Sequence, residues 1–239
     1  MLGRILMSSA LIAVGLGFSG CGDSKSDDMM DDTPKKKVMV EKAPMYEVTV
    51  TNLTVGQPMA PAVAVLHNSN YKMYTLGTQA SVALETLAEG GDNSVLITEA
   101  EATTDVNAVV SYKELLKPGK TLTVTLEGDD EYLTFAGMLV NTNDGFVGLN
   151  SYHIKHLKMD ESEVLMLSTY DAGTEANSES AATVPAQMGE GFNAARDDMN
   201  GVIRVHAGVV TSDALSSSAL DESARFDNPT AKVMIKRIH

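Results

Sequence analysis

Apolar and polar residues alternate along much of the chain after residue 45, which is the pattern of strands with one buried face. Residues 46–53 alternate regularly, and so do residues 122–127, which follow a Lys-Pro-Gly-Lys turn. Further runs rich in β-branched and aromatic residues are separated by clusters of Gly, Asn and Asp. These runs are residues 62–66, 132–140, 146–151, 163–169, 202–206 and 231–238. About eight short strands with little helix predict an all-β fold, an antiparallel β-sandwich.

One short helix interrupts this pattern. In residues 80–88 apolar and polar positions interleave as on a helix with one buried face, and Gly90-Gly91 provides a stop. Residues 171–200 show no clear period, so we expect a long loop, and loops of this length are commonly functional or disordered. Residues 45–239 suffice for one core, so we expect a single domain.

The N-terminus has the layout of a secretory signal peptide. A basic residue precedes an apolar stretch at residues 5–18, which as a helix is shorter than the roughly 30 Å hydrocarbon core of a membrane. Two small residues then stand directly before Cys21, the only cysteine. This spacing resembles the bacterial lipobox, with Phe18 where Leu is usual. We expect residues 1–20 to be a signal peptide and Cys21 to be lipidated; an incidental cysteine beside another cleavage site is the alternative.

Residues 22–44 carry mixed charges and almost no apolar periodicity, so we expect residues 21–44 to form a lipidated cysteine and a flexible tether. The acyl chains of a lipidated Cys21 suffice for stable anchoring. The mature protein is therefore expected to stay on its membrane. By resemblance to lipoprotein sorting rules, Gly22 after the cysteine indicates the outer membrane or the cell surface.

Composition narrows the classes of function. The chain has 18 Lys and Arg against 32 Asp and Glu, a net charge of −14, and no basic cluster lies beside aromatic residues, so nucleic acid is not expected as a partner. One cysteine rules out an intramolecular disulfide and a zinc site built on several thiolates. The sequence also lacks the common motifs for a catalytic serine, a zinc protease, a phosphate loop or a dinucleotide site. We therefore expect no enzymatic activity.

The histidines give a weaker signal for a metal site. His153 and His156 stand three positions apart, so on a strand they would face opposite sides and share a metal only if the segment bends. Solvated histidines are the simpler interpretation. His67 and His206 each end a predicted strand, where a buried hydrogen-bonding role is plausible.

Carboxylates in turns rich in Gly and Asn are more informative. Residues 141–145, Asn-Thr-Asn-Asp-Gly, place several oxygens in a tight bend, and Asp171 and Glu175 flank Gly173 in a second one. Calcium takes 6–8 such hard oxygen ligands in irregular geometry. The same residue types also favour turns for purely local reasons, so turns that bind no ion are the alternative.

Several of these segments together resemble the spondin N-terminal domain family over roughly residues 45–210. The resemblance is carried by Thr49-Val50-Thr51-Asn52-Leu53-Thr54, Leu87-Ala88-Glu89-Gly90-Gly91, Met138-Leu139-Val140-Asn141-Thr142-Asn143-Asp144-Gly145-Phe146-Val147-Gly148 and Tyr170-Asp171-Ala172-Gly173-Thr174-Glu175. It implies a C2-like antiparallel β-sandwich and, as in F-spondin, a calcium ion (Ca2+) in loops at one end.

The resemblance also implies metal ligands in this sequence. Asp144 matches the acid before the aromatic residue of the first motif, and Asp171 and Glu175 match the two acids of the second. Glu175 stands where the family has Asp, and its extra methylene moves the carboxylate by about 1.5 Å.

The expected function is a lipid-anchored calcium-binding β-sandwich, a binding or adhesion module for an unidentified extracellular protein or glycan. One alternative is a structural envelope lipoprotein that binds no ion. Another is a metal-assisted hydrolase built on paired carboxylates, but the chain offers no recognisable setting for a general base.

Overall fold

The structure, a computed structural model, describes residues 42–195 and 201–239. The expected signal peptide, Cys21 and most of the expected tether lie outside the described residues. Among the helices of the described part, none has the length and apolar character needed to cross a membrane.

Regular structure in the described residues consists of nine strands and two α-helices. They are β1 (Met45–Asn52), β2 (Val63–His67), α1 (Val82–Gly90), α2 (Ser94–Glu101), β3 (Val106–Ser111), β4 (Thr121–Glu127), β5 (Tyr132–Met138), β6 (Gly145–His153), β7 (Ser162–Asp171), β8 (Arg204–Val205) and β9 (Ala231–Arg237). Single 3₁₀ turns occur at Pro185–Gln187 and Glu222–Ala224.

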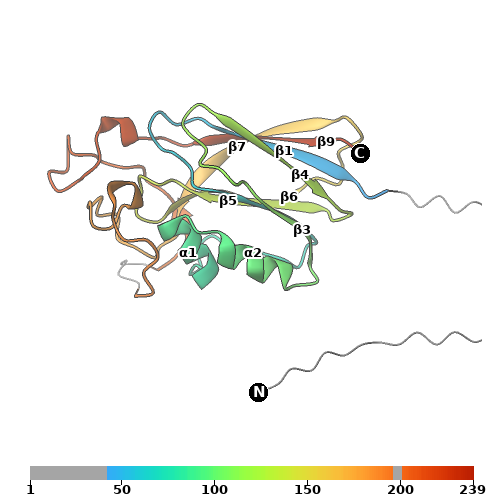
Figure 1. The fold of residues 1–239 in the computed structure, drawn as a ribbon, viewed down its shortest axis with the longest axis horizontal. Helices are drawn as coiled ribbons and strands as arrows, with labels where there is room; N and C mark the ends of the chain where they lie inside the picture. The colour runs from blue at the N-terminus through green and yellow to red at the C-terminus, as the bar shows by residue number, and fades with distance from the viewer. Residues whose placement is uncertain (1–41, 196–200) are drawn as a thin grey trace, which may run out of the picture. The chain divides into compact units, whose positions relative to one another are not determined.

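The strands pair antiparallel in the order β3-β2-β5-β6-β7-β9-β1-β4, and β8 pairs with β7. Strand β7 forms the corner, because residues 168–171 pair with β6 whereas residues 162–167 pair with β9. The sheet therefore folds over on itself into two layers (Figure 1). This arrangement confirms the predicted all-β antiparallel fold.

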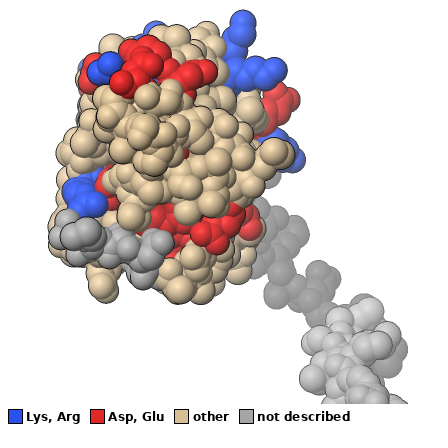
Figure 2. Space-filling view, turned by 90° about the vertical axis from the view of Figure 1, so that its left-hand side faces the viewer, with Lys and Arg blue, Asp and Glu red and all other residues tan. Residues whose placement is uncertain are grey.

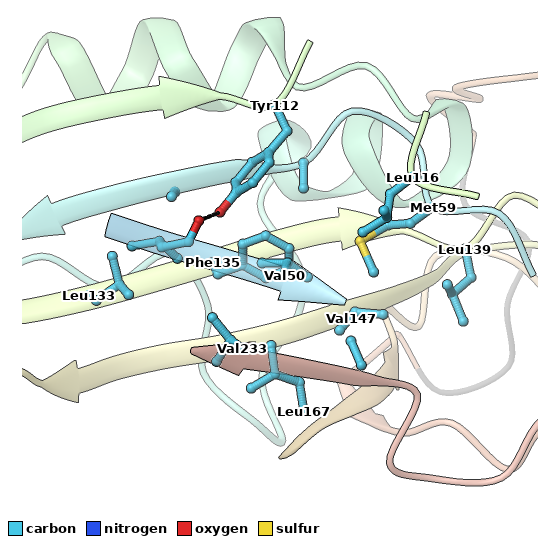
Figure 3. Close-up of a cluster of buried hydrophobic side chains, with 14 of the residues drawn as sticks. Val50, Met59, Tyr112, Leu116, Leu133, Phe135, Leu139, Val147, Leu167 and Val233 are labelled. Carbon is cyan, nitrogen blue, oxygen red and sulfur yellow. Dashed lines mark hydrogen bonds between the residues drawn. The ribbon is translucent and has the colours of Figure 1, made fainter. Parts of the chain in front are cut away.

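The core lies between the two layers, as the alternating pattern predicts. Every second residue of β1 is buried, and the buried side chains meet apolar residues from β5, β7 and β9. Figure 3 shows part of this cluster, in which the Tyr112 hydroxyl donates a hydrogen bond of 2.9 Å to the backbone oxygen of Val48. This bond satisfies the one polar atom of a side chain that is otherwise packed among apolar groups.

A second apolar cluster lies between the helices and the outer face of β2, β5 and β6. Helix α1 begins where the Ser81 hydroxyl accepts a hydrogen bond from Leu84 N, and it ends at Gly91, whose positive φ of 69° suits glycine. The predicted helix is thus confirmed, shifted by two residues. It carries one side of the candidate site described below.

Two elements were not predicted from the sequence. Helix α2 buries only Leu96 and Ala100. Two buried positions are too few for a helical repeat of apolar residues to be recognised in the sequence. Strand β3 is mostly half-buried and shows no alternation. The strand predicted at residues 202–206 is shorter than expected, because only Arg204 and Val205 pair with β7.

Candidate functional site

The three acids predicted to bind a metal come together at one end of the sandwich. Asp144 lies in the turn between β5 and β6, Asp171 is the last residue of β7, and Glu175 follows four residues later. Strand pairing sets Asp171 opposite Gly145, and Ala172 N donates a hydrogen bond of 3.1 Å to the backbone oxygen of Asp144. All three side chains are buried, with at most 2% of each residue exposed.

Local sequence shapes both turns. The Thr142 hydroxyl donates to Leu139 O at 2.6 Å and accepts from Gly145 N at 2.9 Å, which closes the first turn. In the second, Gly173 has a φ of 72° and donates its N–H to Asp171 Oδ1 at 2.8 Å. Any other residue at position 173 would be strained and would collide with the backbone of Val202.

Asp144 is the centre of the site. Its Oδ2 accepts hydrogen bonds from Thr174 N at 2.8 Å, Glu175 N at 3.2 Å and the Thr174 hydroxyl at 3.3 Å. Its Oδ1 is buried and accepts no hydrogen bond from any residue that the structure describes. Burial, with the nearby Asp171 carboxylate as the next cause, raises the pKa of Asp144 to about 7.

The other two acids are held by donors from the protein itself. Asp171 Oδ2 accepts from Asn177 Nδ2 at 2.7 Å and from Arg204, whose Nε and Nη2 each lie at 3.2 Å. Glu175 Oε2 accepts from Asn143 Nδ2 at 3.2 Å. These donors fix the carboxylates in place and reduce their mutual repulsion.

Three further buried acids, Glu85, Glu89 and Glu179, escaped the sequence analysis. Glu85 and Glu89 lie on α1 with 2% and 1% exposed, and Glu89 is close enough to contribute to the raised pKa of Asp144. Glu89 Oε2 accepts a hydrogen bond of 2.7 Å from Asn193 N. A usable signal was present, because acids four positions apart on a helix share one face and these two are interleaved with the buried apolar residues.

The buried carboxylates of Asp144, Asp171, Glu175 and Glu89 therefore lie near one another at this end of the domain. Figure 2 faces this end and shows acidic side chains at its surface, whereas the acids of the site are at most 2% exposed and lie beneath it. Among the described residues, however, no three His, Cys, Asp or Glu side chains are arranged to hold a metal ion directly. The carboxylate oxygens, including the unsatisfied Asp144 Oδ1, are of the type that calcium prefers, but the donors on Asp171 and Glu175 would have to move before an ion could reach those two carboxylates.

The histidines take no part in a metal cluster of the described residues. His67 is fully buried and bonded to Asn68 O at 2.6 Å and to the Thr134 hydroxyl at 2.8 Å, as its position suggested. His206 is also buried, and its Nδ1 accepts from Gly208 N at 2.9 Å. His153 and His156 stack on each other at the surface, where His156 Nε2 contacts Glu163 Oε1 at 3.0 Å.

Comparison with known proteins places this geometry in context. The family model described as Spondin_N matches residues 56–195, which is more than half of the 239-residue chain. The match includes the three predicted acids and both acids of α1, and it ends before Arg204. No curated protein matches the chain.

Proposed function

Because the chain belongs to the spondin N-terminal domain family, we propose that it is an extracellular binding module whose acidic end binds calcium. The family is not known for enzymes, and we propose that this member is likewise non-enzymatic and serves adhesion to a protein or glycan. The observation that carries the calcium proposal is Asp144 Oδ1, a buried carboxylate oxygen without a hydrogen bond from the described residues. A divalent cation would satisfy that oxygen and would offset the burial and the repulsion from Asp171 that raise the pKa of Asp144.

In this proposal Asp144, Asp171 and Glu175 are the ligands, and Glu89 stands beside them. Calcium would order the loops from which the acids come, since it would join the β5–β6 turn to the segment after β7. A structural envelope protein without an ion is the second candidate. It is favoured by the donors that already hold Asp171 and Glu175.

Titration calorimetry of the full chain in detergent, after treatment with a chelator, tests the calcium proposal. We expect a dissociation constant between micromolar and millimolar, the span from calcium sensors to extracellular modules. At 100-fold excess over that constant, calcium would add about 2.7 kcal/mol to the free energy of unfolding. The doubly substituted Asp144→Ala/Asp171→Ala protein should lose the binding heat.

A matched control substitutes two exposed acids, Asp129→Ala/Asp213→Ala, which changes the net charge equally and should leave binding intact. The absence of heat and of any rise in melting temperature at several millimolar calcium would contradict the proposal. It would leave the structural envelope protein as the better account.

We also propose that residues 1–20 direct export, that Cys21 carries the lipid, and that residues 22–44 tether the domain to the outer membrane or cell surface. This proposal rests on the spacing of small residues before the single cysteine. The Cys21→Ser substitution should move the protein from the membrane fraction to the soluble fraction after cell lysis, because the acyl chains provide the anchor. Ser26→Ala, a change within the tether, serves as the control; unchanged membrane association of Cys21→Ser would argue against lipidation.

A further inference from the structure

Arg204 is a cationic side chain in direct contact with Asp171, one of the proposed calcium ligands. Two of its guanidinium nitrogens, Nε and Nη2, each lie 3.2 Å from Asp171 Oδ2. The Arg204 side chain is 37% exposed, whereas that of Asp171 is 3% exposed. The Arg204 side chain is therefore partly open to solvent, whereas the carboxylate that it contacts is not.

The position of Arg204 is built into the fold. In the pairing of β7 with β8, Asp171 and Arg204 are directly opposite each other, so their side chains leave the same face of the sheet. The preceding residue, Ile203, is buried and exchanges backbone hydrogen bonds with the loop at residues 77–78, Gly77 N to Ile203 O and Ile203 N to Thr78 O, both 2.8 Å. The strand pairing and the backbone hydrogen bonds of Ile203 therefore hold Arg204 in this position.

A close backbone contact also fixes the segment that carries Arg204. Gly173 packs so tightly against Val202 that a Cβ at position 173 would lie 2.4 Å from Val202 O. The second acidic motif and the Arg204 strand therefore contact each other directly. Both Arg204 nitrogens contact Asp171 Oδ2, so a cation that took this oxygen would have to displace the guanidinium from it.

We propose that Arg204 competes with calcium for the carboxylate of Asp171. Its guanidinium neutralises Asp171 in the ion-free protein and leaves that oxygen when calcium binds, so the affinity for calcium is lower than the acidic cluster alone would give. A resident cation also explains why a group of buried acids is tolerated without metal. This inference rests on the calcium binding proposed above, and it sets the affinity to the millimolar range typical of extracellular modules.

The test is calorimetric calcium titration of the full chain in detergent as wild type, Arg204→Gln and Arg225→Gln. Arg225 pairs with Glu222 at the surface, both 59% exposed, and its substitution changes the net charge equally. Arg204→Gln should bind calcium at least tenfold more tightly, since one positive charge beside the site is gone, whereas Arg225→Gln should bind as the wild type does.

Thermal melting gives a second readout. In chelator, Arg204→Gln should melt below the wild type, because Asp171 loses its ion pair, and its melting temperature should rise more on addition of calcium. Arg204→Lys retains the charge but not the contact through two nitrogens. The affinity of Arg204→Lys for calcium should lie between those of the wild type and Arg204→Gln. If Arg204→Gln folds only in the presence of calcium, Arg204→Lys still allows the comparison with the wild type.

The outcomes separate the two proposals. Wild-type binding with equal or weaker binding by both Arg204 variants would overturn the role of Arg204 and leave calcium binding in place. Absence of binding by every variant, the wild type included, would overturn calcium binding itself. Binding by Arg204→Gln alone would support the competitor role strongly, because the guanidinium would then exclude the ion completely.

Discussion

Replacing Asp144 by Asn is expected to stabilise the calcium-free protein and to abolish its response to calcium. The pKa of the buried Asp144 carboxyl is raised to about 7, against about 4 for an unfolded chain. Holding it ionised at pH 8 therefore costs the native state roughly 4 kcal/mol. Asparagine removes the charge, and its oxygen can still accept the hydrogen bonds from Thr174 and Glu175.

The pH dependence follows from the sign of this pKa change. The native state binds more protons than the unfolded state between about pH 4 and pH 7, so the contribution of Asp144 to stability falls as the pH rises through this window. Burial lowers the pKa values of His67 and His206, and these groups oppose the trend because they reduce stability as the pH falls below about 6.5. The difference between wild type and Asp144→Asn isolates the contribution of Asp144.

Differential scanning calorimetry in chelator is the measurement. At pH 8 Asp144→Asn should melt about 8–16 °C above the wild type, since 1 kcal/mol corresponds to about 2–4 °C in a domain of this size. At pH 4 the two should nearly coincide. Addition of calcium at pH 8 should raise the melting temperature of the wild type only. Asp213→Asn, at an exposed position, is the control; a lower melting temperature of Asp144→Asn at pH 8 in chelator would show that the buried charge is not the cost inferred here.

Replacing Glu179 by Ala is expected to give the largest loss of stability. Glu179 is 4% exposed, and its carboxylate accepts hydrogen bonds from Val210 N, from Thr211 N at 2.9 Å and from the Ser218 hydroxyl at 2.6 Å. Its own N–H donates to Asn143 Oδ1 at 3.1 Å, beside Asp144. One side chain thus holds the loop at residues 207–220 against the acidic end.

Alanine would leave these three donors without their acceptor. A buried donor that loses its partner costs about 1–3 kcal/mol, so the total is roughly 3–5 kcal/mol. Urea unfolding should show this loss, and hydrogen exchange should become faster at the amides of Val210 and Thr211. Glu179→Gln retains one acceptor oxygen and should be intermediate. Glu190→Ala, at an exposed position of the same loop region, should be close to the wild type; equal stabilities of the two alanine variants would mean that the loop finds other acceptors.

Local patterns in the sequence determined most of the fold. The alternation in residues 46–53 and 122–127 predicted β1 and β4, because a strand with one buried face repeats every two residues. Gly90-Gly91 marked the C-terminal end of α1, since helix termination depends on a few neighbouring residues. The same holds for the candidate ligands Asp144, Asp171 and Glu175. They could be found because turn-forming residues and family motifs each occupy a short segment of the chain.

Only the tertiary structure decided what surrounds those acids. Glu89 becomes part of the site because α1 packs against the sheet, and Arg204 reaches Asp171 through strand pairing across 33 positions of the chain. The Glu179 carboxylate accepts hydrogen bonds from three donors that lie more than 30 positions away in the chain. Such contacts depend on register and packing between distant segments, and no local pattern encodes them. The sequence thus indicated which acids are candidate ligands, whereas the fold decided which protein groups hold those acids in place.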